Sequence, residues 1–419
     1  MARTVDDEHC LIAVLNAAGH AHLLVSQFAE ARTCFEEALT MARHRGNTSA
    51  STDALVGSGR CALMQGDYSE AQASLSEGLE LAREASEVHT EGVALAALGG
   101  LARLQGDGTA AKQRFEQSAE LAREAATPFP LALALLGLGR LAFADEPQAA
   151  RAWFEEALTI SRDATLAHIV PPCLVGLAQV ATAADDAQAA KRLLDEALEA
   201  AGRGGNGGGE ADALHELGRM ASTARHTDEA ASRHHRALML YAEIAAPAGI
   251  ADSLQALAGL AASHGRYTAA ARLLGAAHST RNAHSTRNIH GCAPGAREQR
   301  DYDAHVRAAR DRLGDPTFET AWAAGEALST EQAIAEASKG RGPRRRPAKG
   351  WQALTPAEHR VVALAQQGLS NAEIAKKLII APSTVAVHLT HSYGKLGIRS
   401  RMQLITDPRW SGGPGPGKR

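Results

Sequence analysis

Residues 31 to 277 follow one pattern of small and large positions that returns about every forty residues. Each unit has a small residue, usually a large apolar residue four positions later, and another small residue three positions after that. The seven triplets are Ala31-Phe35-Ala38, Ala71-Leu75-Gly78, Ala111-Phe115-Ser118, Ala150-Phe154-Ala157, Ala190-Leu194-Ala197, Ala230-His234-Ala237 and Ala270-Leu274-Ala277. The spacing i, i+4, i+7 places each triplet on one face of a helix. We expect the small residues to let a neighbouring helix approach closely, while the large residue fills the space between.

A second helix is predicted before each of these. Turn signals such as Gln65-Gly66-Asp67 separate the two helices of a unit, and four units carry glycine twelve residues before the triplet. Paired helices of this kind resemble the tetratricopeptide repeat, lengthened from its usual period of about 34 residues. Seven stacked pairs predict an α-solenoid with a concave surface. The resemblance implies that this groove binds a small inducer or a protein partner, and the sequence does not decide which.

Three local features interrupt the pattern. The glycine-rich run at 202–209 predicts a long flexible loop. His234 and His235 are adjacent and point to opposite sides of a helix, which favours surface and interface histidines over a metal site. The hexad at 278–283 is repeated at 284–289 with one change, which we interpret as a duplication within a loop because histidines six apart do not share a helix face.

The C-terminal end shows four short helical patterns in close succession. Thr355 with Glu358, and Ser370 with Glu373, each have the spacing of a capping box. They predict helices from 355 to about 367 and from 370 to 378, and Pro382 opens a third helix that reaches about Leu396. A fourth runs from 400 to about 406. A short helix, a three-residue turn and a longer helix are typical of a helix-turn-helix, whose second helix enters the DNA major groove.

Several blocks of this end resemble the LuxR family of regulators. They are Leu354-Thr355 with Glu358, and residues 368–375, 384–388 and 395–401. The resemblance implies that three positions contact bases, namely Ala386, Val387 and Thr390. It also implies contacts with phosphates from Asn371, Thr384, Lys395, Arg399 and Arg401. Many family members carry lysine or another long polar side chain at the first and third base-contacting positions, which this chain lacks, so direct contact is limited to thymine methyl groups and a hydroxyl.

Periodicity divides the third helix into two faces. Val385, Leu389, Ser392 and Leu396 should face the core, whereas Ser383, Ala386, Val387, Thr390 and Gly394 should face DNA. Three departures from the family pattern weaken the domain. Ala381 replaces a capping Ser or Thr, at a cost of about 1 kcal/mol. Gly394 lies inside a helix, at about 0.5–1 kcal/mol. Ser392 replaces an apolar core residue.

Charge separates the two ends of the chain. The net charge is −3, but residues 339–350 carry six Lys/Arg and no acid, and residues 351–410 carry seven Lys/Arg against three acids. The first 338 residues are therefore strongly acidic, so a polyanion is attracted only by the C-terminal end. The five cysteines are scattered and odd in number, which is typical of small buried side chains in a reducing cytoplasm. No stretch of eighteen apolar residues, phosphate-binding glycine loop, metal-ligand spacing or nucleophile–base pairing occurs, so a membrane protein, a cofactor and an enzyme are not indicated.

These patterns predict an all-α protein, an α-solenoid followed by a small four-helix LuxR-type domain. We expect helical repeats over 1–279, a helical connecting segment over 280–338, a basic linker over 339–350, the DNA-binding domain over 351–407 and a tail over 408–419. LuxR regulators with such repeats usually carry an upstream ATPase, so the chain resembles the C-terminal half of that architecture. The expected function is a transcriptional regulator that binds double-stranded DNA, as a homodimer and with RNA polymerase as a partner. The alternative is a repeat scaffold with a weakened DNA-binding end that acts through protein contacts.

Overall fold

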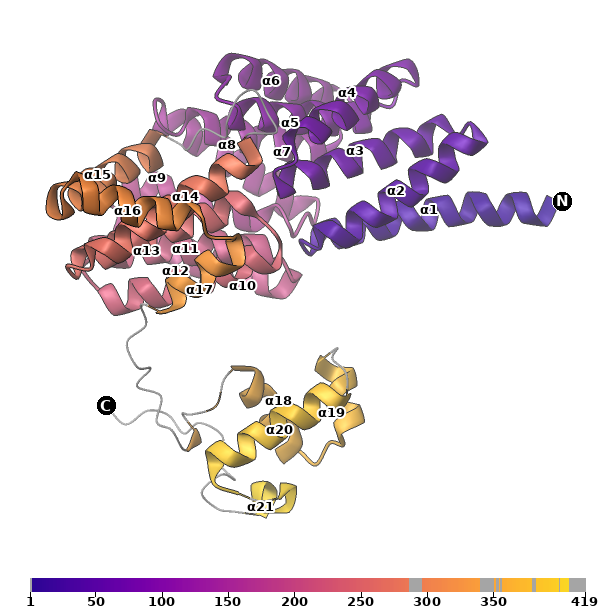
Figure 1. The fold of residues 1–419 in the computed structure, drawn as a ribbon. Coiled ribbons are helices and arrows are strands. Elements are labelled where there is room, and N and C mark those ends of the chain that lie inside the picture. The colour runs from indigo at the N-terminus through magenta and orange to yellow at the C-terminus, as the bar shows by residue number, and fades with distance from the viewer. Residues whose placement is uncertain are drawn as a thin grey trace. The chain divides into compact units, whose positions relative to one another are not determined.

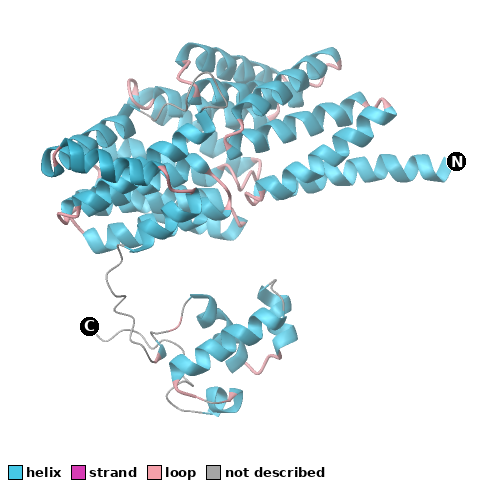
Figure 2. Ribbon diagram, viewed as in Figure 1, coloured by secondary structure: helices cyan, strands magenta, loops and turns pink. Residues whose placement is uncertain are grey.

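The computed structural model describes residues 2–285, 296–339, 350–351, 354, 356–378, 382–398 and 400–406. Every regular element among them is a helix (Figure 2). Contacts divide the chain into two compact units, Met1–Gly340 and Arg341–Arg419, and each is described by itself. No helix among the described residues is both long and apolar enough to cross a membrane.

Seven helix pairs form the first part of the larger unit (Figure 1), and each pair corresponds to one predicted repeat. The pairs are α1 (Ala2–Leu24) with α2 (Phe28–Arg45), α3 (Thr48–Gln65) with α4 (Tyr68–Glu84), α5 (Val88–Leu104) with α6 (Gly108–Glu124), α7 (Pro128–Ala142) with α8 (Pro147–Asp163), α9 (Val170–Ala183) with α10 (Ala187–Gly204), α11 (Gly207–Thr223) with α12 (Thr227–Glu243), and α13 (Pro247–Ser263) with α14 (Tyr267–Ser285). The predicted helical-repeat fold is confirmed.

The triplet positions form the core between these helices. Phe154 is fully buried, and its ring is held between two glycines, Gly139 on the paired helix α7 and Gly176 on α9 of the next repeat. A Cβ atom placed on either glycine would lie 2.5 or 2.6 Å from the ring, closer than real Cβ atoms approach. Phe35 and Phe115 lie against glycines in the same way. Small residues therefore bring the helices together around each large one, as the periodicity predicts.

The glycine-rich run at 202–209 is not a long loop, so that prediction is wrong. Helix α10 continues to Gly204, Gly205 adopts a left-handed conformation with φ of 64°, and α11 starts at Gly207. Asn206 caps α11, because its Oδ1 accepts a hydrogen bond of 2.8 Å from the Gly209 amide. A Cβ on Gly209 would lie 2.7 Å from Pro171 on α9. The run is helical because the Asn206 cap and the packing of Gly209 against Pro171 stabilise a helical backbone that glycine residues alone do not favour.

Burial also corrects two predictions about side chains. His234 and His235 are 1% and 5% exposed, so both are buried and neither is a surface residue. His234 occupies the place that phenylalanine or leucine takes in other repeats, and its ring packs against Gly218. Cys61 and Cys173 are buried as expected, whereas Cys10 is exposed and Cys34 is only partly buried. Cys292 and the second copy of the hexad (residues 286–289) lie outside the described residues, but the first copy is helical, within α14.

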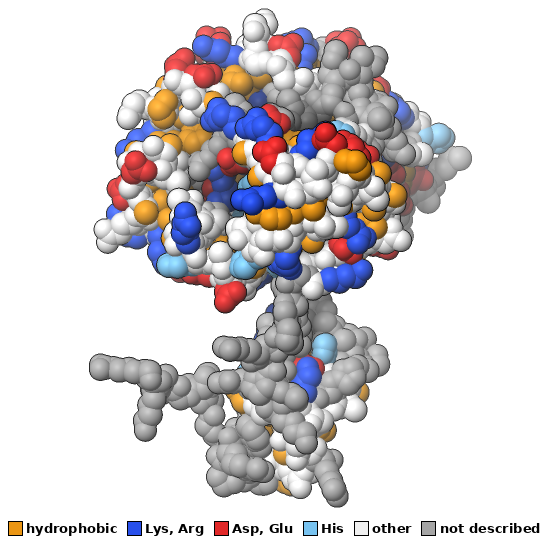
Figure 3. All heavy atoms as spheres, turned by 60° about the vertical axis from the view of Figure 1, so that its left-hand side comes forward, with side chains coloured by type: hydrophobic (Ala, Val, Ile, Leu, Met, Phe, Trp, Pro, Cys, Tyr) orange, Lys and Arg blue, Asp and Glu red, His pale blue; other side chains and the backbone are white. Residues whose placement is uncertain are grey.

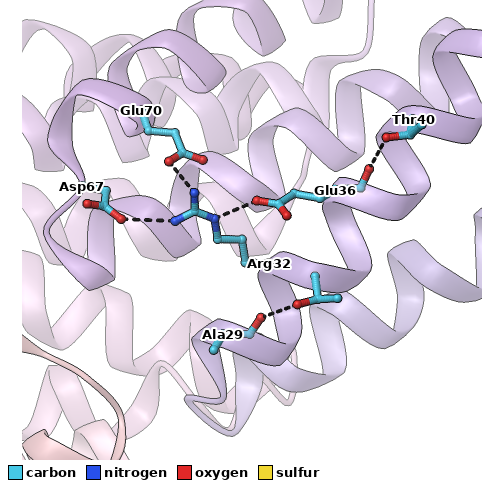
Figure 4. Close-up of polar contacts among 7 residues, drawn as sticks. Ala29, Arg32, Glu36, Thr40, Asp67 and Glu70 are labelled. Carbon is cyan, nitrogen blue, oxygen red and sulfur yellow. Dashed lines mark hydrogen bonds and ion pairs between the residues drawn. The ribbon is translucent and has the colours of Figure 1, made fainter.

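Ion pairs join the second helices of successive repeats on their exposed side. Figure 4 shows Arg32 of α2, whose guanidinium reaches Glu36 on its own helix and Asp67 and Glu70 in the next repeat, at 2.8, 3.1 and 2.5 Å. The same connection recurs between Arg43 and Glu77, Arg123 and Glu156, and Arg162 and Glu196. Exposed pairs of this kind contribute little stability each, typically 0–1 kcal/mol. They do repeat at the spacing of the units.

The chain of repeats returns on itself, so that repeat 1 touches repeat 6. The turn after α1 meets the start of α11, 180 residues further on, where the Ser26 hydroxyl lies 3.4 Å from Asn206 Oδ1 and accepts a 3.3 Å hydrogen bond from the Gly208 amide. Asn206 also donates to the His168 carbonyl at 3.0 Å. Asn206 therefore ties together the first, fifth and sixth repeats.

Three further helices complete the larger unit. They are α15 (Ala296–Leu313), α16 (Asp315–Glu326) and α17 (Thr330–Lys339). Helices α14 and α16 cross closely at Gly275 and Gly325, where a Cβ would meet backbone atoms at 2.3 and 2.0 Å. Helix α17 is held on the last repeats, because the ring nitrogen Nε2 of His235 lies 2.9 Å from the Ala337 carbonyl oxygen.

The smaller unit contains four short helices. They are α18 (Pro356–Gln366), α19 (Asn371–Leu378), α20 (Pro382–Leu396) and α21 (Arg401–Thr406). Their bounds agree with the predicted helices to within about one residue. Most of the predicted linker, residues 340–349, and the predicted tail lie outside the described residues.

Candidate nucleic-acid interface

One face of α20 forms the core of the smaller unit. Val385, Leu389 and Leu396 are 0%, 4% and 5% exposed, and they pack with residues of α18, α19 and α21. Ser392 on the same face is fully buried, and its hydroxyl donates a 2.7 Å hydrogen bond to the His388 carbonyl. The polar side chain at this core position is thus satisfied within its own helix.

The opposite face of α20 is exposed. Ala386, Thr390 and Gly394 all lie on it, as predicted from the periodicity. Thr390 donates its hydroxyl hydrogen to the Ala386 carbonyl at 2.9 Å, which leaves its oxygen able to accept a hydrogen bond. Nothing in the described residues would touch a Cβ placed on Gly394. This face is shallow and uncharged at the described positions.

Helix α19 is held at its N-terminus by the capping box that the sequence predicts. The Glu373 amide donates to the Ser370 hydroxyl at 3.3 Å, and the Ser370 amide donates to the Glu373 carboxylate at 2.7 Å. The Ser370 hydroxyl donates to the same carboxylate oxygen, also at 2.7 Å. These hydrogen bonds lower the pKa of Glu373, because they favour its charged form.

Three of the predicted phosphate-contacting side chains, Lys395, Arg401 and Asn371, are engaged within the domain. Lys395 Nζ lies 2.8 and 2.7 Å from the two carboxylate oxygens of Glu358. The Glu358 side chain is 5% exposed and that of Lys395 is 32% exposed, so the pair is largely shielded from water. The pair joins α18 to the last turn of α20.

Arg401 is engaged in a similar way. Its guanidinium donates to Asn371 Oδ1 at 2.9 Å and to the Leu369 carbonyl. Asn371 itself is partly buried at the start of α19. Arg401 therefore connects α21 to the turn that precedes α19.

The remaining predicted positions cannot be placed by their side chains. The backbones of Thr384 and Val387 belong to α20, but their side chains lie outside the described residues, and Arg399 lies outside them altogether. Sequence reasoning did not single out Lys377, which is exposed on α19 one turn after Glu373. The available signal was its position, since the first helix of a helix-turn-helix crosses the DNA backbone.

The larger unit offers a different surface. Figure 3 shows one of its faces, on which Lys and Arg side chains alternate with Asp and Glu. Ion pairs between repeats, such as Arg43 with Glu77 and Arg162 with Glu196, are part of the mixture of charges on the larger unit.

Comparison with known proteins identifies both parts of the chain. Residues 352–406 match the family described as "Bacterial regulatory proteins, luxR family", and residues 6–84 match the tetratricopeptide repeat. The smaller unit is thus a LuxR-family helix-turn-helix domain, and the larger one contains tetratricopeptide-like repeats.

Relatives agree with this assignment. A protein of Mycobacterium bovis, named as an HTH-type transcriptional regulator, is 40% identical over 57% of this chain and 26% of its own length. GfsR of Streptomyces halstedii, named in the same way, is 46% identical over 15% of this chain and 25% of its own length. The chain spans about a quarter of the length of these relatives.

A solved structure has a similar helical arrangement. The Rap protein complexed with competence and sporulation factor is 13% identical, with a TM-score of 0.48, over 78% of this chain and 97% of that one.

Proposed function

We propose that this chain, which carries a LuxR-family helix-turn-helix domain after a helical-repeat unit, binds double-stranded DNA and regulates transcription. The observation that carries the proposal is the division of α20. Its buried face fixes it to α18, α19 and α21, and its opposite face is exposed at Ala386, Thr390 and Gly394.

The exposed face of α20 gives the base contacts of the proposal. Ala386, together with Val387 from the family pattern, would contact thymine methyl groups, and Thr390 would offer its hydroxyl. No long polar donor is present at Ala386 or Thr390 to make the bidentate contacts that discriminate best between bases. We therefore infer that base contacts add modest discrimination to a larger phosphate component.

Phosphate contacts are proposed for both helices of the motif. Asn371 at the start of α19 follows from the family pattern, and a helix N-terminus favours a nearby anion, although the Asn371 Oδ1 already accepts a hydrogen bond from Arg401. Thr384 and Arg399 follow from the family pattern, and Lys377 is added because it is exposed on α19. Lys395 and Arg401 would have to exchange a protein partner for a phosphate, so we expect smaller contributions from them.

The remaining parts of the proposal concern partners. We propose that the chain acts in the cytoplasm as a homodimer on DNA, together with RNA polymerase, and that the repeat unit binds an inducer or partner that changes DNA occupancy. The specific observation that favours the alternative, a scaffold with a weakened DNA-binding domain, is the small uncharged face of α20.

A binding titration of the full chain separates the two functions. DNA from upstream of its own gene and a shuffled duplex of the same composition are compared by gel shift across a salt series. We expect tighter binding to the natural DNA and a slope set by the phosphates neutralised, about −0.9 for each. Equal affinity for the two duplexes would remove sequence-specific binding. Absence of binding to either would overturn the proposal in favour of the scaffold.

A positive charge added to the exposed face of α20 tests whether this face points toward DNA. Ala386→Lys should tighten binding to both duplexes and steepen the salt dependence by about one phosphate. The control is Ala29→Lys, which adds the same charge at an exposed helical position of the larger unit. If the two variants behave alike, the exposed face of α20 does not meet DNA.

A further inference from the structure

A partly open cavity lies where repeat 1 returns onto repeat 6. Its volume is about 270 Å³, and first helices of six successive repeats contribute to its wall, from α1 to α11. Ser26, Asn206 and Gly208, which make the contact between the two repeats, also line it. The volume lies near the lower end of ligand pockets, about 300–1,000 Å³. The cavity thus suits a small molecule and would place it where the superhelix closes.

The wall carries an excess of positive charge. Three arginines line the cavity, Arg60 from α3, Arg103 from α5 and Arg140 from α7, against a single carboxylate, Asp212 of α11. Asp212 accepts a 2.6 Å hydrogen bond from the Tyr241 hydroxyl, and burial raises its pKa, an effect that the nearby charge of Arg140 opposes. The net charge of the wall is therefore positive.

Arg60 lacks an acidic partner within ion-pair distance among the described residues. Its guanidinium instead lies over the ring of Phe129, 5.3 Å from the centroid. Burial lowers the pKa of this side chain, because a cation shielded from water loses hydration. Arg60 is partly buried, and a partly buried cation is stabilised by an anion or by hydrogen bonds. Asp53 acts on Arg60 electrostatically without an ion-pair contact, so an anion bound in the cavity would be its first direct partner of opposite charge among the described residues.

A second polar group on the wall also lacks a partner. The Nε2 atom of His168 is buried without a hydrogen bond to any described residue. Burial and the nearby charge of Arg60 lower the pKa of His168 to about 4, so the ring is neutral at pH 7. A neutral imidazole keeps one N–H donor, so His168 places a hydrogen-bonding group beside the cavity. Unpartnered buried groups of this kind are uncommon in proteins.

Most of the remaining wall is apolar. The apolar lining includes Leu24 of α1, Leu63 of α3, Leu133 and Leu136 of α7, and Ile169 directly before α9. Convergent polar groups on an otherwise apolar wall are the usual arrangement of a small-molecule site. The composition therefore fits a ligand with a charged end and an apolar body.

We propose that the closed turn of the repeats binds a small organic anion, with a carboxylate or phosphate group at Arg60 and Arg140 and an apolar body against the leucines. The ligand would link the wall of repeats 2 to 4 to the contact between repeats 1 and 6. This inference deepens the proposed function, because it names the class of inducer and rests on that function for its effect on DNA.

The first experiment measures binding to the full chain. Benzoate and phenyl phosphate serve as anionic probes, and benzamide and benzyl alcohol serve as their neutral counterparts. We expect at least one anion to raise the unfolding temperature and to give a saturable calorimetric titration, and the neutral compounds to do neither. The stronger anion identifies the head group as carboxylate or phosphate. Failure of both anions, or equal binding of a neutral counterpart, would overturn the proposal.

Two variants locate the site. Arg60→Met keeps an unbranched apolar stem but removes the charge and the hydrogen-bond donors, and should weaken anion binding about tenfold to a hundredfold. Gly100→Leu should block the cavity without removing a charge, since a Cβ there meets only Leu63, at 3.8 Å. The control is Arg151→Met, on the exposed face of α8, which should bind as the unaltered chain does. Undiminished binding in both cavity variants would place the anion elsewhere.

The DNA titration, run with and without the bound anion, keeps the two proposals apart. Anion binding without DNA binding would contradict the proposed function alone. DNA binding without any anion binding would contradict this inference alone.

Discussion

The two units of the chain are each held together by a different kind of contact. In the repeat unit one contact recurs, a large side chain set against glycines of the paired helix and of the next repeat. In the helix-turn-helix domain no contact recurs, and single polar links such as Glu358–Lys395 and Arg401–Asn371 join helices that share a small core. The repeat unit can therefore lose one contact and keep its neighbours, whereas the small domain depends on each of its few links.

Removal of one large core side chain should produce the largest effect. Phe154→Ala empties a fully buried site between α7 and α9 and should lower the free energy of unfolding of the repeat unit by about 3–5 kcal/mol. Hydrogen exchange should show the loss in the neighbouring repeats, with the smaller unit unchanged. The neighbouring exposed change Glu155→Ala is the control. Equal loss of protection in both units would contradict their independence.

The ion pair in the small domain should have the next largest effect. Glu358→Gln leaves Lys395 without its carboxylate and should destabilise that domain by about 1–3 kcal/mol. Lys395→Met completes a double-mutant cycle, and the combined variant should be less destabilised than the sum of the two single changes. Additive effects would show that the pair makes no net contribution. Protection of amide hydrogens in α18 and α20 gives the measurement.

The same glycine-to-alanine change should have opposite signs in the two units. In Gly137→Ala the new Cβ would lie 2.3 Å from the Phe115 ring, so we expect a loss of about 1–3 kcal/mol. In Gly394→Ala it meets nothing within 4 Å on an exposed helix, so we expect a gain of about 0.5–1 kcal/mol. Denaturant unfolding of the full chain followed by hydrogen exchange assigns each change to its unit. A gain for Gly137→Ala would contradict the packing described for the repeats.

His234→Phe should give a smaller effect that depends on pH. Burial, with His215 and Arg219 nearby, lowers the pKa of His234 to about 2, so the unfolded chain binds a proton first as the pH falls below about 6.5. The repeat unit therefore loses up to about 2 kcal/mol between pH 7 and pH 5 through this group. Phenylalanine, which other repeats carry at this position, should reduce that loss and add about 1 kcal/mol at pH 7 by removing an unpartnered ring nitrogen. An unchanged pH profile would show that other groups cause the acid sensitivity.

Much of the candidate interface could be predicted because it depends on local patterns. Capping residues predicted the start of α19, and the i, i+4, i+7 spacing separated the buried from the exposed face of α20. The engagement of Lys395 could not be predicted in this way. Its partner Glu358 lies 37 residues away on another helix, and no local rule links two such positions.

The sequence by itself determined the helices, the seven repeats and the family of the small domain, because periodicity, caps and turn residues act within a few positions along the chain. The tertiary structure alone decided what happens where distant segments meet. It made a helix start within a run of glycines, because Asn206 and Pro171 hold that backbone in place. It buried two histidines that composition assigns to the surface. It also brought repeat 1 onto repeat 6 and gathered three arginines around one cavity, since the curvature of a superhelix accumulates from many small rotations between neighbouring repeats.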